Sequence, residues 1–447
     1  MDLQCCRIVL VGCGSIGQAL IPLLILHLHL DPKKICVLTA DEIGKDVARF
    51  YNIDFHVQSL NAENYESILA VNLQQGDLLI NVSVGVSSLA LVKWCNRHSV
   101  FYLDTCVEPW QGGYQNEEHL TSTTNCYLRN AIFNEHYSHN TTAIIAHGAN
   151  PGLISHFVKA GLMQLAKVKG VYTWDSWAHL AELLGVKVIQ IAELDTQTTH
   201  EDIPSDSFLN TWSSLGLISE GWQRAEAGWG SHEKMENKTS MLTSVGKTIY
   251  LNTHGAACLV KSWVPASGEI VSMLISHHEA SSIADLLTLA DTENNAPTYR
   301  PTVYFAYRPS PLARESIRRW RLNNFRLPKN LMLIRDTVES GFDQLGALFV
   351  FEGGSYWYGS TVTIEQARHL LPYNNATSIQ VVAGILGALM WMQKNPEAGV
   401  VEAESMDADI ILSAALPFLG EVAGFLTKWQ PSLNGELLLE EFLISGL

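Results

Sequence analysis

The chain contains 447 residues, of which 47% are hydrophobic and 17% are charged, and its formal net charge at pH 7 is -16. Because this length exceeds what one hydrophobic core usually supports, we expect two large domains of ordinary globular composition. The negative charge argues against nucleic-acid binding, which needs clustered Lys and Arg, and it is compatible with a small cationic ligand.

The cysteines and the apolar stretches bear on the compartment of the chain. None of the eight cysteines forms a CxxC pair, which favours free thiols in a reducing compartment and argues against a metal site. No signal peptide is expected, because the first apolar run leads directly into glycines. Residues 19–30 and 376–393 are apolar but contain proline, glycine or polar residues, so both are predicted to be buried helices rather than membrane spans. The expected location is the cytoplasm.

Strand-like and helix-like segments alternate along the first third of the chain. Strand-like runs occupy residues 7–12, 34–39, 77–82, 101–104 and 142–146, and helix-like patterns occupy residues 15–28, 41–51 and 87–97. Strands that alternate with helices indicate right-handed crossovers and a parallel sheet. We therefore predict an α/β domain over residues 1–152.

Beyond residue 153 strand-like runs follow one another with few helices between them, at residues 186–192, 248–252, 270–275 and 302–306. This pattern predicts an α+β substrate-binding domain with a mainly antiparallel sheet over residues 153–362, which we also expect to form dimer contacts. The Arg-rich residues 308–328 are interpreted as a basic, polar surface segment. Residues 363–447 contain three predicted helices that are expected to pack back on the first domain, at residues 364–371, 378–394 and 407–415.

A glycine motif follows the first predicted strand. The segment from Gly12 to Gly17 reads Gly-Cys-Gly-Ser-Ile-Gly and lies between a β-branched strand and a helix. In this context the first glycine permits a tight turn, the second lets the backbone approach a pyrophosphate, and the third allows close packing of helix and strand. The N–H groups of the helix start attract the phosphates. The motif therefore predicts a Rossmann-type dinucleotide-binding domain.

The residues after the second predicted strand bear on the choice of dinucleotide. Thr39 closes this strand and Asp41 lies two positions further on, where an acid can bind the ribose of NAD. Neither Arg nor Lys follows the strand directly, which favours NAD over NADP. Asp41 has an equally plausible alternative role as the cap of the following helix.

Five further segments place acidic, amide or imidazole groups beside strands and tryptophans, at residues 104–110, 147–152, 193–197, 210–222 and 276–279. Carboxylates together with tryptophan suit an ammonium ligand, through ion pairs and a cation–π contact of ~0.5–2 kcal/mol. Each residue taken alone also has an ordinary structural role. Trp212 could belong to the core, Glu220 could pair with a lysine, His277 could be a structural histidine, and Glu193 and Glu108 could be surface and turn residues.

The same segments carry a family resemblance. The motifs GCGSIGQALIPLL, DTCVEPW, HGANPG, IAELDTQ, NTWS with ISEGW, GWGSHEK, SHHEASSIADLL, YRPTVYFAY and SYWYGS with NNATSIQV occur in this order. Together they resemble the bacterial homospermidine synthase family, within the saccharopine dehydrogenase-like group. The resemblance covers essentially the whole chain.

The resemblance implies a reaction in which NAD is recycled as a prosthetic group. Two putrescine molecules would give symmetric homospermidine and ammonia through imine intermediates, with spermidine as a possible alternative donor. Apart from the resemblance, a homodimer is expected because it is the commonest assembly. An amine must lose its proton before a hydride leaves its carbon, so one site residue should act as a base. The sequence does not identify that residue.

The resemblance also implies roles for particular residues. Trp212 would make the cation–π contact, and Glu220 would neutralise an amine and move protons. Glu193 and Glu108 would bind the other ammonium groups, and Asp343 the distal amine. His277 and Asn150 would lie near the nicotinamide and take part in catalysis. The residues expected to contact the cofactor are Gly12, Gly14, Ser15, Ile16, Gly17, Thr39, Asp41, Ser83, Asp104, Thr105 and Asn150.

One departure and two alternatives accompany this interpretation. The family usually has an Asp directly after the second strand, where this chain has Thr39, so the ribose contact is open. A saccharopine- or carboxynorspermidine-type dehydrogenase is one alternative, although an amino-acid substrate would need Arg or Lys to bind its carboxylate. A non-catalytic NAD-sensing protein is the other, because dinucleotide folds also serve as sensors.

Overall fold

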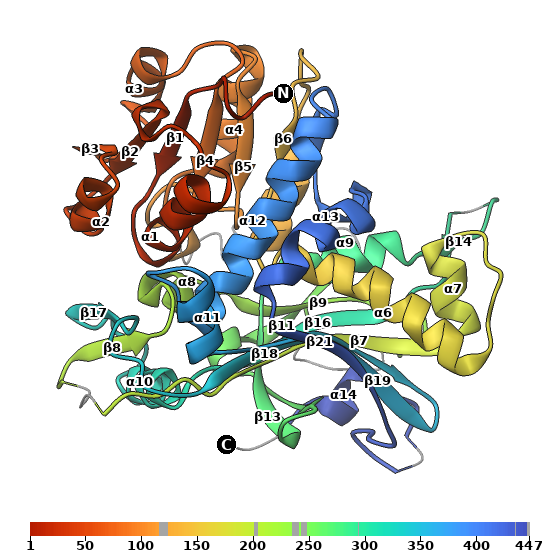
Figure 1. The fold of residues 1–447 in the computed structure, drawn as a ribbon. Coiled ribbons are helices and arrows are strands. Elements are labelled where there is room, and N and C mark those ends of the chain that lie inside the picture. The colour runs from red at the N-terminus through yellow and green to blue at the C-terminus, as the bar shows by residue number, and fades with distance from the viewer. Residues whose placement is uncertain are drawn as a thin grey trace.

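Two sheets joined by helices make up the computed structural model of the chain (Figure 1). It describes residues 1–115, 124–200, 204–234, 241–242, 248–293, 295–433 and 435–444. The helices α1–α4 lie beside the first sheet, and α12 runs from that sheet towards the second one (Figure 1). The predicted fold class, a Rossmann-type domain joined to an α+β domain, is confirmed.

The first sheet has seven strands in the order β20-β6-β5-β4-β1-β2-β3, and every pairing in it is parallel. Its central strands are continuous apolar runs because helices cover both of their faces. The strands are β1 (Ile8–Val11), β2 (Ile35–Thr39), β3 (Asp54–Val57), β4 (Leu78–Asn81), β5 (Phe101–Asp104), β6 (Ala143–Ile144) and β20 (Val400–Val401). The helices are α1 (Ser15–Pro22), α2 (Lys45–Phe50), α3 (Tyr65–Asn72), α4 (Ser88–Arg97) and α5 (Asn125–Phe133).

The second sheet is mixed, because β16 and β7 are parallel whereas its other pairings are antiparallel. Its main path is β10-β11-β9-β16-β7-β18-β19-β21, and the hairpin of β12 and β13 joins it through β16. The strands are β7 (Val186–Asp195), β9 (Arg224–Gly228), β10 (Met241–Leu242), β11 (Thr248–His254), β12 (Leu259–Val264), β13 (Gly268–Ile275), β16 (Thr302–Arg308), β18 (Phe342–Phe351), β19 (Gly354–Thr363) and β21 (Glu421–Thr427).

Two small ribbons and nine helices accompany this sheet in the described part of the chain. The ribbons are β8 (Ser207–Asn210) with β17 (Asn330–Leu333), and β14 (Leu289–Ala290) with β15 (Pro297–Tyr299). The helices are α6 (Leu153–Lys169), α7 (Trp177–Leu183), α8 (Ser214–Trp222), α9 (Glu279–Leu286), α10 (Pro311–Leu322), α11 (Ile364–Leu370), α12 (Ala376–Lys394), α13 (Ala408–Ala415) and α14 (Leu439–Phe442).

The interpretation of residues 308–328 as a basic, polar surface segment holds for most of its residues, which are exposed or half-buried, but it missed a helix with a buried face. These residues contain α10, which begins at Pro311 after the cap Ser310 and buries Ala313, Ile317 and Trp320. The buried residues recur at helical spacing, so the segment is an amphipathic helix whose arginines lie on its outer face. Helix α6, which was not predicted, packs against β18 and β19 and covers the second sheet.

The region after residue 363 contributes to both sheets. Helix α12 packs against α1, and β20 pairs with β6 at the edge of the first sheet, whereas β21 pairs with β19 in the second. Among the described helices, α12 alone is long and apolar enough to cross a membrane, and 83% of its most apolar window is buried inside the fold. This burial matches the sequence-based prediction of a core helix.

Candidate active site

The glycine motif folds as the dinucleotide-binding turn requires. Gly12 has φ +92°, which favours glycine, and a Cβ at Gly17 would collide with the carbonyl oxygen of Gly12. A Cβ at Gly14 would meet nothing, so the backbone is open to a ligand there. The turn therefore fits a pyrophosphate at the start of α1.

A cleft runs from this turn along the loops after β1, β2 and β4, the course that a dinucleotide takes in such folds. Its wall includes Gly12, Gly14, Ser15, Ile16, Thr39, Asp41 and Ser83, all of which were predicted to contact the cofactor. Gly17 lies beneath the turn instead. None of the described residues that line the cleft is Lys or Arg, so nothing there matches a 2′-phosphate.

The loop after β2 places both candidates for the ribose contact in the cleft. Thr39 is buried at the end of the strand, and Asp41 is exposed, with its Oδ1 accepting the backbone N–H of Ile43 at 2.8 Å. Asp41 therefore closes a turn and does not cap α2, which begins at Lys45 after Gly44. Asp41 lines the cleft, as a residue that binds the ribose of NAD must.

Residues after β5 were predicted to contact cofactor or substrate, and the structure divides them. Asp104 lines neither cavity, because it is fully buried and accepts hydrogen bonds from the Tyr102 hydroxyl and the Ala146 N–H. Thr105 lines the smaller cavity described below. Glu108 lines the dinucleotide cleft, where its Oε2 accepts the N–H of Gly85 at 3.2 Å, and burial raises its pKa to about 8.

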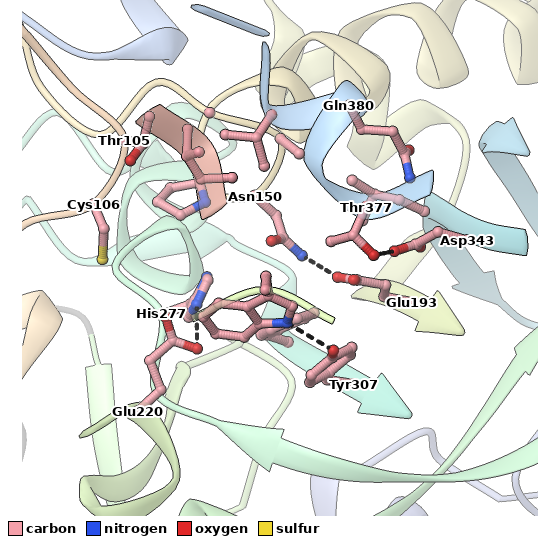
Figure 2. Close-up of a pocket in the computed structure, with 18 residues that line it drawn as sticks. Thr105, Cys106, Asn150, Glu193, Glu220, His277, Tyr307, Asp343, Thr377 and Gln380 are labelled. Carbon is pink, nitrogen blue, oxygen red and sulfur yellow. Dashed lines mark hydrogen bonds and ion pairs between the residues drawn. The ribbon is translucent and has the colours of Figure 1, made fainter. Parts of the chain in front are cut away.

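A second, smaller cavity meets the cleft at Ile16, which lines both. The cavity lies where the carboxyl ends of the strands face the domain boundary, a usual place for a small-molecule site. Figure 2 shows two acidic groups on opposite sides of it, Glu220 beside His277 and Glu193 beside Asp343. The remaining predicted residues that line it are Trp212, Asn150 and Thr105.

One acidic group is built by strand register. Glu193 of β7 is paired with Tyr307 of β16, and Asp195 of β7 is paired with Asp343 of β18. Alternate residues of a strand point to one face, so Glu193, Asp195 and Asp343 share that face. Like charges opposite one another destabilise a sheet, so this arrangement favours a bound cation or bound protons.

Hydrogen bonds hold these carboxylates but leave them poorly neutralised. Asn150 donates from Nδ2 to Glu193 Oε2 at 2.7 Å and Thr377 donates to Asp343 (Figure 2). Thr211 donates to Asp195 at 2.6 Å. Burial, followed by repulsion from Asp343, raises the pKa of Glu193 well above its usual range. Burial and Asp195 do the same to the pKa of Asp343, and burial raises the pKa of Asp195 to about 6.

The loop that carries Asn150 is held by a close approach of α12. A Cβ at Gly384 would collide with the carbonyl oxygen of Gly148, so the helix can reach this loop only with glycine at that position. Thr377 and Gln380 on the same helix line the cavity. The C-terminal region therefore forms part of the site.

The other acidic group surrounds His277, which follows β13. Its Nε2 lies 3.3 Å from Glu220 Oε2 on α8, and its Nδ1 lies 3.3 Å from Glu279 Oε2 at the start of α9. Burial alone would lower the pKa of His277, but the two carboxylates outweigh it and raise that pKa to about 10. The two flanking carboxylates therefore favour the protonated form of the imidazole.

Trp212 lies between β8 and α8 and lines the cavity. Its Nε1–H donates to the Tyr307 hydroxyl at 2.9 Å, which ties the indole to β16 of the second sheet. The sequence analysis gave no individual role to Asp195 and Glu279, which lie in two of the five polar segments, or to Tyr307, Thr377 and Gln380. All five fall within the quoted motifs, which were the available signal.

The described residues contain no cluster of three or more His, Cys, Asp or Glu that could hold a metal ion. All eight cysteines are free thiols. Cys106 lines the smaller cavity, and burial raises the pKa of its thiol well above the usual value.

Two family descriptions together match most of the chain. Residues 8–144 match the saccharopine dehydrogenase NADP binding domain, and residues 148–425 match the saccharopine dehydrogenase C-terminal domain. The fold agrees with a saccharopine dehydrogenase (L-Glu forming) from Saccharomyces cerevisiae at a TM-score of 0.50, 11% identity and coverage of 94% of this chain and 99% of that one. The chain therefore belongs to the saccharopine dehydrogenase family.

More similar proteins narrow this placement. Homospermidine synthases from Mesorhizobium japonicum and Blastochloris viridis are each 37% identical over 95% of this chain, and they are covered over 91% and 92% of their own lengths. A crystal structure of a homospermidine synthase from Legionella pneumophila in complex with NAD superposes with a TM-score of 0.91 at 36% identity, covering 99% of this chain and 98% of that one. Within its family, the chain belongs with the homospermidine synthases and is an NAD-dependent enzyme.

The position of Asp41 in the cleft predicts its role in cofactor choice. We expect Asp41→Ala to weaken NAD binding roughly tenfold, the loss of about one charge-assisted hydrogen bond, and to narrow the preference for NAD over NADP. Titration calorimetry with both dinucleotides measures this change. Asp46→Ala, which removes an exposed carboxylate from α2, is the matched control and should change neither affinity. An unaltered NAD preference in Asp41→Ala would assign the ribose contact elsewhere.

The buried carboxylates predict how stability changes with pH in the substrate-free protein. A carboxyl group with a raised pKa in the folded state stabilises fully below its unfolded pKa, and this contribution is lost as the pH rises through the folded pKa. With folded pKa values of about 6 for Asp195 and about 8 for Glu108, the melting temperature should fall between about pH 4 and pH 8.

Two measurements by differential scanning fluorimetry test this dependence. Glu193→Gln should make the pH profile shallower, because burial raises the pKa of this group as well. Glu63→Gln, an exposed substitution, should leave the profile as it is. Putrescine should raise the melting temperature more at pH 8 than at pH 5, since a cation binds the ionised carboxylates. If putrescine raises the melting temperature equally at pH 5 and pH 8, the buried carboxylates are not the groups that bind the cation.

Proposed function

We propose that the chain catalyses homospermidine synthesis, in which two putrescine molecules give symmetric homospermidine and ammonia. The supporting observation is the cavity with acidic groups on opposite sides, Glu220 with Glu279 and Glu193 with Asp343, and a tryptophan in its wall. A diamine has an ammonium group at each end and needs an anion for each of them. Spermidine would serve as an alternative aminobutyl donor.

The cofactor would lie with its pyrophosphate on the turn from Gly12 to Gly17 and its nicotinamide near Ile16, where the cleft meets the cavity. When bound, NAD supplies a group that takes a hydride from an amine carbon and returns it to an imine carbon. Thr105 and Asn150 line the cavity and would limit where the reacting carbon can lie.

The carboxylates of β7 and β18 would bind the ammonium group that does not react. Glu193 and Asp343 both line the cavity, and their raised pKa values mean that an arriving cation takes the place of a proton. Asn150 donates to Glu193 and thereby orients its carboxylate. Glu108, which lies in the cleft, would act on the substrate only where the two spaces join.

Proton transfer at the reacting end would involve Glu220 and His277. Glu220 is buried beside the imidazolium of His277 and would accept the proton of the ammonium group before its carbon is oxidised. Glu279 holds Nδ1 of His277, so Nε2 faces Glu220 and the cavity. The same pair would return a proton to the departing ammonia.

Trp212 would present the face of its indole to the charged ammonium or iminium group of the substrate. A desolvated cation–π contact contributes about 2 kcal/mol, and a charge that develops during the reaction would be stabilised by it. Tyr307 fixes the indole by accepting its N–H.

The lining of the cavity favours this function over a dehydrogenase that acts on an amino acid. Such a substrate needs Arg or Lys for its carboxylate, and no described residue that lines the cavity is basic except His277, which two carboxylates flank.

We also propose a cytoplasmic homodimer that binds neither membrane nor nucleic acid. The free cysteines, the net charge of -16 and the prevalence of homodimers support this.

Incubation of the purified protein with NAD and putrescine tests the proposal. We expect homospermidine and ammonia in equal amounts by mass spectrometry and ammonia assay, without net formation of NADH, because the hydride is returned within the cycle. Putrescine that is not consumed, or consumption with one NADH for each ammonia, would overturn the proposal.

Variants of Trp212 test the cation–π contact. Trp212→Leu should reduce kcat/KM roughly 30-fold, which corresponds to about 2 kcal/mol, whereas Trp212→Phe should retain more activity because it keeps an aromatic face. Trp263→Ala on the β12 hairpin, outside both cavities, is the control and should leave kcat/KM unchanged. Equal losses in the Leu and Phe variants would assign Trp212 to packing alone.

A further inference from the structure

The dinucleotide cleft is lined by both halves of the chain. The first half supplies the glycine turn and the loop after β2, and the second half supplies Leu331, Met332 and Leu333 of β17. Leu331 and Leu333 are 43% and 36% exposed, so this strand presents apolar side chains to the cleft rather than to the core. A cofactor in the cleft would therefore lie between the two halves and contact β17.

A hydrogen-bonded chain joins β17 to the glycine turn. Arg335 follows this strand by two residues, and its Nη1 donates to the Oε1 of Gln18 on α1 at 2.6 Å. Gln18 in turn donates from Nε2 to the carbonyl oxygen of Gly14 at 3.0 Å. The Arg335 side chain is only 12% exposed, so water competes weakly for this contact.

Arg335 is fixed on its own side of the cleft as well. Asp336 accepts hydrogen bonds from Nε and Nη2 of Arg335. The guanidinium carbon of Arg335 lies 5.5 Å from the ring centroid of Tyr373. Arg368 donates to the backbone carbonyl oxygen of Arg335, and Asn374 donates to that of Ala19 on α1 at 3.0 Å. Arg335 is therefore a pre-positioned group that reaches across the domain boundary.

We propose that the contact between Arg335 and Gln18 acts as a clasp that holds β17 against the glycine turn and retains the dinucleotide through the reaction cycle. Arg335 is a positioning residue, because it acts on the cleft through Gln18 and β17 and does not line it. The proposal rests on the proposed function, in which the cofactor must remain bound between oxidation of one amine and reduction of the new imine. A redox-neutral cycle needs such retention.

The exchange rate of bound NAD tests the clasp without any amine present. Isotope-labelled NAD bound to the purified protein is chased with unlabelled NAD, and the loss of label is followed by mass spectrometry after rapid filtration. Arg335→Met keeps the apolar stem and removes the charged donor, so it should release NAD at least about tenfold faster than the wild type. Gln18→Leu removes the acceptor from the other side and should have a similar effect.

Two further variants make the exchange measurement specific. The double variant should release NAD no faster than the more affected single variant, because both substitutions remove the same contact. Arg318→Met removes another arginine of the second half, one that pairs with Glu315 on α10, and should release NAD at the wild-type rate. Wild-type release by both Arg335→Met and Gln18→Leu, each with an unchanged melting temperature, would overturn the clasp. If one variant fails to fold, the other decides.

The second readout is the fate of putrescine in Arg335→Met. If the reduced cofactor escapes before the second half of the cycle, the amine has lost a hydride to NAD and become an iminium ion, which water hydrolyses to 4-aminobutanal and ammonium. NADH and the aldehyde should then accumulate in equal amounts, which the wild type should not show. If the variants release NAD fast but the wild type makes no homospermidine, the clasp is supported and the proposed function is rejected. If the wild type makes homospermidine but both variants release NAD at the wild-type rate, the proposed function is supported and the clasp is rejected.

Discussion

The pairing of β7 with strands on both sides is the constraint on which the site depends. It places Tyr307, Glu193, Asp195 and Asp343 on one face of the second sheet, although these residues are remote in sequence. A shift of one residue in either pairing would turn an acidic side chain towards the opposite face. The polar site is therefore a property of the sheet as a whole, and the surrounding helices supply the groups that complete it.

The same arrangement stores an electrostatic cost that a ligand can relieve. Burial raises the pKa values of these carboxylates, and a cation that binds between them replaces protons and repulsion with ion pairs. In the acidic group on the opposite side, Glu220 and Glu279 flank His277 and raise its pKa. The repulsion between these two carboxylates is therefore reduced without a bound ligand. The side of the cavity with Glu193 and Asp343 is thus suited to bind a cation, and the side with Glu220 and His277 is suited to proton transfer.

How much the sequence reveals depends on how local the signal is. The glycine turn was predictable because its requirements lie within a few residues, and the parallel sheet followed from alternating segments. Helix α10 was missed because its arginines mask an apolar spacing of three and four residues, and Asp104 was placed in the cofactor site although its carboxylate is spent on Tyr102 and Ala146. Tyr307 and Thr377 could not be singled out, since strand register and the docking of α12 bring them to the cavity.

The return of the chain to its first sheet has a consequence for synthesis on the ribosome. The edge strand β20 and the helix α12, which packs on α1, emerge only after nearly all of the second sheet has been made. Until then the dinucleotide-binding half lacks an edge and a cover, so its apolar surface stays exposed to water and to chaperones. The nascent chain can therefore complete its cofactor-binding half only near the end of translation, and the two halves reach their final form together.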